Sequence, residues 1–212
     1  MSTTYGADTA LTGGRGTPDA WSPGSDGHNW TQTRGNQTLS YDSVNHQLVL
    51  TFNGSTTSGV MTYAGLTVAD CEITVNAVQT GASDIIGPAM RVVDANNYIQ
   101  LVIGNSANLL ELRKDAASTF TTVAFAAFTV SAGTKYSFRF RAIGSTYWGK
   151  VWSGAEPAAW NIGPFVDTSL TSGLFGVAGR PNATGNTTKY DSFLAQSPVR
   201  AALFDGYGGM FS

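Results

Sequence analysis

The chain has 212 residues, a hydrophobic fraction of 42% and a formal net charge of −2. This length and apolar content allow a substantial core and exclude a chain that is disordered throughout. Charged residues make up only 12%, about half the usual share, and no Lys/Arg cluster occurs, so no nucleic-acid partner is expected. The single cysteine, Cys71, excludes an intrachain disulfide and a cysteine-based zinc site.

The N-terminal region, residues 1–37, is rich in Gly, Thr, Asp and Pro and predicts an irregular arm. We expect Trp21 and Trp30 to pack on the folded domain, because an exposed tryptophan in a loop is unfavourable. Residues 1–6 have neither a basic region nor an apolar core, so no secretory signal is predicted. The longest apolar run, 123–130, is far too short to cross a bilayer, and no membrane partner is expected.

The region 38–195 contains short runs in which apolar and polar residues alternate, the pattern of a half-buried β-strand. Up to residue 130, the predicted strands are 39–41, 47–52, 60–63, 71–78, 88–93, 98–103, 109–114 and 121–128. The tetrapeptide Asp94–Asn97 predicts a hairpin turn, since Asp and Asn tolerate turn geometry. Helix signals are poor throughout, and Cys71 is expected to be a small buried residue.

The clearest pattern lies in residues 135–194. Four apolar residues in 136–142 alternate with one serine and two arginines, and Gly144-Ser145 then predicts a tight turn. Residues 148–152 follow with Trp, Lys and Trp on one face, so the two runs predict an antiparallel hairpin. Pro157 lacks an amide hydrogen, so 156–159 predicts a loop, and further strands are predicted at 174–178 and 189–195.

The order of these pieces resembles the C-terminal half of a concanavalin A-like lectin/glucanase domain. It is similar in particular to the laminin-G-like versions found in actinobacterial surface proteins and in minor tail or other virion proteins of bacteriophages. The matching residues are Lys150-Val151-Trp152, Glu156-Pro157 with Trp160, Asp167 with Leu170, Gly173 with Gly176-Val177, and Asp191 with Phe193. The N-terminal half matches only in general character. The resemblance implies an all-β fold, a jelly-roll β-sandwich of two antiparallel sheets, undivided over residues 38–195.

The resemblance also implies a non-enzymatic virion protein of a bacteriophage, either a capsid decoration or a minor tail component. The protein is then expected in the virion after synthesis in the host cytoplasm, with an extracellular or cell-surface location as the alternative. Expected partners are other virion proteins and further copies of the chain. Residues 196–212 predict a docking tail, or alternatively a frayed or folded-back terminus, and its large apolar residues are Leu203, Phe204, Tyr207, Met210 and Phe211.

The rival function is a carbohydrate-binding module for a surface glycan. Aromatic side chains can serve as platforms for sugar rings, and four of them lie close together in the sequence: Tyr147, Trp148, Trp152 and Trp160. The alternative is that these aromatic residues pack within the sandwich, as Trp152 and Trp160 do in the resembling domains.

A glycoside hydrolase on the same fold is a third reading. Hydrolysis needs two carboxylates across a cleft, and the only glutamates, Glu72, Glu111 and Glu156, do not lie in one run. His28 and His46 lie in polar, turn-like settings and are expected to be surface residues. No catalytic residue and no enzymatic activity are therefore expected.

Calcium is the one cofactor that the resemblance implies. Many concanavalin A-like domains hold Ca²⁺ between the N-terminal segment and the closing strand, using a carboxylate and backbone carbonyls as hard oxygen ligands. Asp191 matches the closing-strand aspartate, and Asp8 is the second candidate. Alternatively, Asp191 only accepts hydrogen bonds from backbone amides at a strand end.

Overall fold

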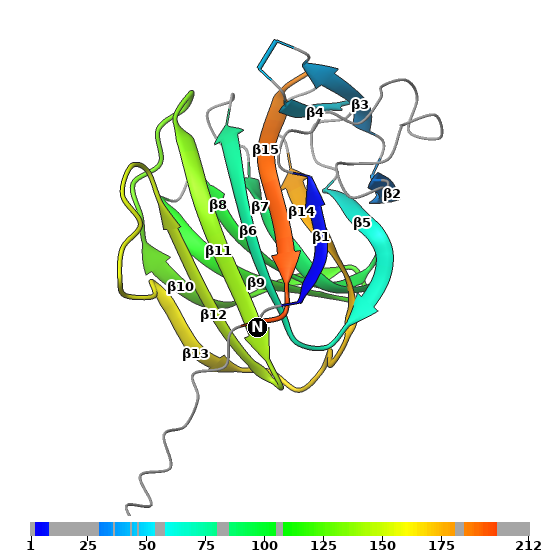
Figure 1. Cartoon of the computed structure of the whole chain (residues 1–212), viewed down its shortest axis with the longest axis vertical. Helices are drawn as coiled ribbons and strands as arrows, with labels where there is room; N and C mark the ends of the chain where they lie inside the picture. Colours follow the sequence, from blue (N-terminus) through cyan, green and yellow to red (C-terminus); the bar gives the residue numbers. More distant parts are fainter. Residues whose placement is uncertain are drawn as a thin grey trace, which may run out of the picture.

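The computed structural model describes residues 3–8, 30–35, 37–42, 44–45, 47–53, 58–79, 85–104, 108–180 and 185–198. Over these residues the chain is all β, and two antiparallel sheets form a sandwich (Figure 1). The predicted all-β sandwich is confirmed. None of the described residues forms a helix that is long and apolar enough to span a membrane.

The first sheet faces the viewer in Figure 1 and has the strand order β13-β12-β11-β6-β15-β4-β3 among the described residues. The N-terminal strand β1 pairs with β15 outside this order. The strands of this sheet are β1 (Thr4–Asp8), β3 (Gln37–Asp42), β4 (Gln47–Phe52), β6 (Cys71–Gln79), β11 (Lys135–Ile143), β12 (Thr146–Trp152), β13 (Ile162–Val166) and β15 (Thr187–Gln196).

The second sheet lies behind the first and has the order β10-β9-β8-β7-β14-β5-β2 in the described part of the chain. Four consecutive strands, β7 to β10, form a meander on one side of it. The strands are β2 (Trp30–Arg34), β5 (Gly59–Val68), β7 (Ile85–Asp94), β8 (Asn97–Gly104), β9 (Leu109–Ala116), β10 (Thr119–Ala127) and β14 (Gly173–Arg180).

The core lies between the sheets and is formed by alternate side chains of most strands. On β11 the buried residues alternate with half-buried ones, as predicted, and the three apolar residues predicted to share a face of β6 are buried in the core: Ile73, Val75 and Ala77. Trp30 packs with its ring centroid 4.9 Å from that of Tyr63 and 5.0 Å from that of Phe193. The expected packing of Trp30 is thus confirmed, whereas Trp21 lies outside the described residues.

Three strands are absent from the sequence prediction. β1 and β2 fall within residues 1–37, which predict an irregular arm, so the sandwich takes in strands that precede residue 38. β13 contains Pro164, which the outermost position in its sheet tolerates because an edge strand has unpaired groups on one side. The loop at 156–159 and the turns at 94–97 and 144–145 are confirmed.

A buried arginine joins several loops at one end of the sandwich. Arg91 is only 2% exposed and has a left-handed backbone with φ of 52°. Its Nη1 donates to the Tyr147 hydroxyl and to the Leu170 carbonyl, each at 2.6 Å. Its Nη2 donates to the Ala69 carbonyl at 3.2 Å and to the Gly144 carbonyl. One guanidinium therefore connects the β5–β6 turn, the β11–β12 turn and the segment that follows β13.

Candidate functional site

The four aromatic residues predicted to bind a sugar do not share one surface. Tyr147 points into the core, where it has no exposed surface, and burial raises the pKa of its hydroxyl to about 12. Trp148 and Trp152 have the opposite parity on β12 and lie half-buried on the outer face of the first sheet, and Trp160 lies in the loop that follows. The prediction for Tyr147 is therefore wrong, because a strand turns neighbouring side chains to opposite faces.

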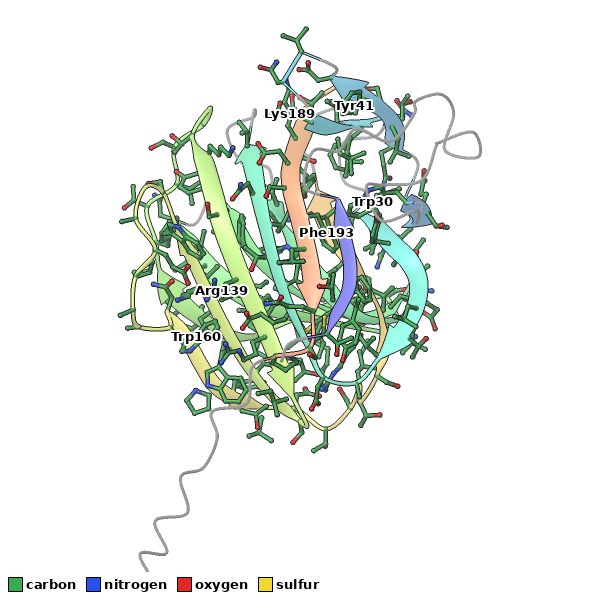
Figure 2. All side chains as sticks on the ribbon, viewed as in Figure 1. Trp30, Tyr41, Arg139, Trp160, Lys189 and Phe193 are labelled. Atoms are coloured by element: carbon green, nitrogen blue, oxygen red, sulfur yellow. The ribbon has the colours of Figure 1, made fainter. Side chains whose placement is uncertain are left out.

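An ion-pair network lies on this outer face of the first sheet. Glu72 is 4% exposed and is bonded to Arg141, whose Nη2 lies 2.5 Å from the carboxylate. Arg139 lies between Glu72, at 3.9 Å, and Glu156, at 3.0 Å. Figure 2 shows Arg139 on the sheet face turned toward the viewer. Each of these four side chains therefore has an opposite charge beside it.

Two tryptophans on this side, Trp152 and Trp160, lie close to the ammonium group of Lys150. Lys150 lies 2.6 Å from Glu156 and donates to the Pro157 carbonyl at 2.9 Å. Its ammonium lies 5.0 Å from the Trp160 ring centroid and 5.8 Å from that of Trp152. The geometry of these two rings is that of packing residues, held by cation–π contacts.

A second polar surface lies on the outer face of the second sheet, and we call it the arginine face. Its members are Arg34 on β2, Tyr98 and Gln100 on β8, Glu111, Arg113 and Asp115 on β9, Phe120 and Thr122 on β10, and Arg180 on β14. The strand register places Gln100, Arg113 and Thr122 in one row, since Gln100 pairs with Arg113, and Arg113 with Thr122. Arg180 lies four positions along β14 from Gly176, which belongs to the same row. Their neighbours in the sequence, such as Leu101 and Leu112, point into the core.

The second sheet curves around the arginine face. The guanidinium of Arg34 on β2 lies 5.1 Å from the ring centroid of Phe120 on β10, although these strands are at opposite ends of the sheet. In a flat sheet, six strand spacings would separate them by roughly 29 Å. Curvature also explains why Gln100 and Glu111 are only 4% and 6% exposed on an outer face.

One end of the arginine face is closed by an ion pair. Arg34 Nη1 donates to the Asp115 carboxylate, to the Ala95 carbonyl at 3.0 Å and to the Tyr98 hydroxyl at 3.3 Å. Asp115 has no exposed surface, and among the described residues its Oδ1 has no hydrogen-bond partner. Burial raises the pKa of Asp115 and that of Tyr98. This end is largely closed to solvent.

The middle of the arginine face presents ordered polar groups. Arg113 Nη2 donates to Glu111 at 2.5 Å, and the Thr122 hydroxyl donates to the same carboxylate at 2.8 Å. Gln100 lies opposite Arg113 in the ladder, and in the described chain the buried Nε of Arg113 has no acceptor. Donors and acceptors are therefore fixed in place before any ligand arrives.

Arg180 is the least compensated charge on the arginine face. It is half-buried, and burial lowers the pKa of its guanidinium, as does the neighbouring charge of Arg113, while Glu111 and Tyr98 act in the opposite sense. Within the described ranges, no salt bridge and no hydrogen bond reaches its side chain. A cation in this state favours an added anionic or polar partner.

The calcium site implied for Asp191 and Asp8 stays a prediction. Asp191 lies 2.8 Å from Lys135, so a lysine already neutralises its carboxylate. The backbone of Asp8 lies opposite Phe193, two residues from Asp191, but its side chain is not among those described. The described residues contain no group of three or more His, Cys, Asp or Glu residues that could hold a metal ion.

Several predicted features fall outside the described residues. These are His28, His46 and the docking residues Leu203, Phe204, Tyr207, Met210 and Phe211. The docking tail and the virion and homo-oligomer partners therefore stay predictions. Cys71 is buried as expected, and burial raises the pKa of its thiol to about 12.

No protein-family model matches the chain, and no curated protein matches it. Solved structures share its fold. A carbohydrate-binding module, CBM66 from Bacillus subtilis, is 14% identical with a TM-score of 0.65, covering 79% of this chain and 95% of that one. A protein of unknown function with a galectin-like fold, also from Bacillus subtilis, is 13% identical with a TM-score of 0.61, covering 81% and 90%.

A xylan β-1,4-xylosidase from Bacillus halodurans is 14% identical with a TM-score of 0.56 over 75% of this chain, which corresponds to 34% of the enzyme's length. At such identities these likenesses establish the fold alone. They confirm the concanavalin A-like jelly-roll sandwich that the sequence predicts.

Proposed function

We propose that this protein is a non-enzymatic carbohydrate-binding module and that the arginine face holds the sugar. The observation that carries the proposal is the row of pre-ordered, partly buried polar side chains on the inward-curving outer face of the second sheet. The sequence alone indicates this function as the alternative to a virion protein. We prefer it to the virion role, for which no described residue provides support.

The chemistry of the arginine face suits a sugar. Each sugar hydroxyl both donates and accepts hydrogen bonds, and the face offers donors from Arg113 and acceptors on Glu111 at fixed positions. Gln100 adds an amide that has both functions. Partial burial strengthens such bonds relative to bulk water, and side chains that are already ordered lose little entropy on binding.

The structural neighbours support the same function. CBM66 is described as a carbohydrate-binding module, and the chain covers nearly all of it. A second neighbour has a galectin-like fold and covers a similar share of the chain. These likenesses concern the fold, so the residues of the arginine face carry the argument for this chain.

The carboxylates argue for binding without hydrolysis. Glycosidases place two carboxyl groups across the scissile bond, one of them free to protonate the leaving group. Here Glu111 and Asp115 are each bonded to an arginine, and Asp115 has no exposed surface. Glu72 and Glu156 lie on the outer face of the other sheet, where Arg139 connects them. We therefore expect no turnover of β-glucans.

A glycan array with two single variants tests the proposal. Gln100→Ala removes an amide from the arginine face. Trp148→Ala removes the aromatic ring of the other face that, among the described residues, has no cation–π contact. We expect the protein to bind at least one glycan class, Gln100→Ala to weaken this binding and Trp148→Ala to leave it unchanged. The opposite response would move the site to the first sheet. Absence of binding to any glycan would contradict the proposed function.

A further inference from the structure

We infer that the arginine face selects sugars that carry a carboxylate, that is, uronic acid residues, through Arg180 together with Arg113. This inference rests on the proposed function and adds the chemical class of the ligand. It is drawn from the balance of charges on the arginine face and from the bonds that those charges make.

The charges on the arginine face do not cancel. Two of its three arginines are paired, Arg34 with Asp115 and Arg113 with Glu111. Arg180 is left with no hydrogen bond or ion pair in the described residues, although it is half-buried. The face therefore carries one excess positive charge, in a chain whose formal net charge is −2.

The excess charge is also partly desolvated. Removing a cation from water without a partner is unfavourable, and burial lowers the pKa of Arg180 for this reason. A ligand that supplies an anion at this point restores the missing compensation. A neutral sugar supplies only hydroxyl dipoles, which compensate a full charge less well.

The shape of the donors favours a carboxylate. A guanidinium presents parallel N–H donors that match the two oxygens of a carboxylate. Arg113 and Arg180 lie on the same outer face, with Arg180 four positions along β14 from Gly176, which shares a row with Gln100 and Arg113. The charge of Arg113 lowers the pKa of Arg180, and the buried Nε of Arg113 is unpaired in the described chain. The two guanidinium groups and the Gln100 amide beside Arg113 thus provide donors for the carboxylate and for the ring hydroxyls, and the Thr122 oxygen provides an acceptor.

The test compares sugars that differ only at C6. The probes are β-1,4-linked trimers of glucose and glucuronate and of mannose and mannuronate, with acetate alone at equal concentration, each titrated by calorimetry. We expect a uronate trimer to bind at least about tenfold tighter than its neutral counterpart, as one charge-assisted hydrogen bond can provide, and acetate not to bind measurably. Equal binding of a neutral and an acidic trimer, or of neutral glycans only, would overturn the inference and leave the proposed function standing.

Variants separate the role of Arg180 from a structural one. Arg180→Gln should remove the uronate preference, and Arg180→Lys should keep part of it, since lysine keeps the charge without the planar donor pair. Lys135→Gln is the matched control, because it removes one positive charge from the first sheet, and it should leave the preference unchanged. Arg180→Gln should not lower the melting temperature, because it removes an uncompensated charge. A uronate preference that survives Arg180→Gln would contradict the role assigned to Arg180. If the native protein binds no glycan at all, the proposed function itself is contradicted.

Discussion

Replacing Arg91 by methionine should destabilise the sandwich strongly, although Arg91 is a charged residue and not an apolar core residue. Arg91 donates four hydrogen bonds to neutral acceptors, at 2.6 Å to Tyr147 and Leu170, at 3.2 Å to Ala69, and to Gly144. Methionine has a similar length and keeps the packing, so the substitution isolates the loss of the cation and its bonds.

The expected magnitude follows from two opposing contributions. A hydrogen bond from a charged donor contributes about 1.5–3 kcal/mol, so four of them give several kcal/mol. Desolvation of the guanidinium offsets a large part of this gain, since Arg91 is only 2% exposed and its bonded partners are neutral. We expect a net loss of about 3 kcal/mol in the free energy of unfolding. In a domain of this size, this corresponds to roughly 6–12 °C in the melting temperature.

Urea unfolding followed by tryptophan fluorescence measures this loss. Lys135→Met is the matched control, because it removes a cation whose side chain is 55% exposed, and it should cost less than about 1 kcal/mol. Tyr147→Phe, alone and combined with Arg91→Met, measures the coupling across the bond to the hydroxyl group. A loss below about 1 kcal/mol for Arg91→Met would refute the reasoning that this arginine stabilises the three loops.

Three further predictions concern acid stability, strand pairing and thiol reactivity. Hydrogen bonds from Asn45 lower the pKa of Asp42 to about 2, so the stability that Asp42 contributes to the fold is present above its ordinary pKa near 4 and is lost as the pH falls toward 2. Asp42→Asn should therefore flatten the dependence of stability on pH over this window, in acid titrations followed by fluorescence. An unchanged curve would contradict the lowered pKa. Gly176→Ala should lower the free energy of unfolding in urea by about 3 kcal/mol or more, because the new methyl group would lie 1.8 Å from the Met61 carbonyl oxygen of β5. Gly104→Ala is the control. Its methyl group would lie 3.5 Å from the nearest atom, so the change should stay within about 1 kcal/mol. Burial raises the pKa of the Cys71 thiol to about 12, so Cys71 should not react with a disulfide reagent at pH 8 until guanidinium chloride unfolds the protein. Rapid labelling of the native protein would count against the burial of this thiol.

Alternation of apolar and polar residues is enough to predict most strands. The run 136–142 becomes β11 and 47–52 becomes β4, because each has a buried face and a wetter face that the sequence displays directly. β1 and β13 lack this signal. β1 is a five-residue strand with a central glycine, and among the described strands it pairs with β15 alone. β13 contains a proline. Tertiary pairing therefore decides the conformation of both.

The site is harder to predict, because its residues are far apart in the sequence and come together only when the strands pair and the sheet curves. Arg34 and Asp115 are 81 positions apart, and β2 and β9 come together only when the second sheet curves. The available signal is that Glu111, Arg113 and Asp115 alternate with Leu110 and Leu112 on β9. The same alternation could have excluded Tyr147 from a surface platform, since Trp148 next to it takes the outer face.

Amide chemical-shift mapping tests the central claim most directly, namely that the arginine face is the sugar site. The measurement follows the backbone amides of the labelled protein during titration with the glycan that binds most tightly on the array. If the arginine face holds the sugar, the largest shifts should cluster around Gln100, Arg113, Thr122 and Arg180, on β8, β9, β10 and β14. Shifts confined to β11, β12 and the loop that carries Trp160 would place the sugar on the first sheet and contradict it.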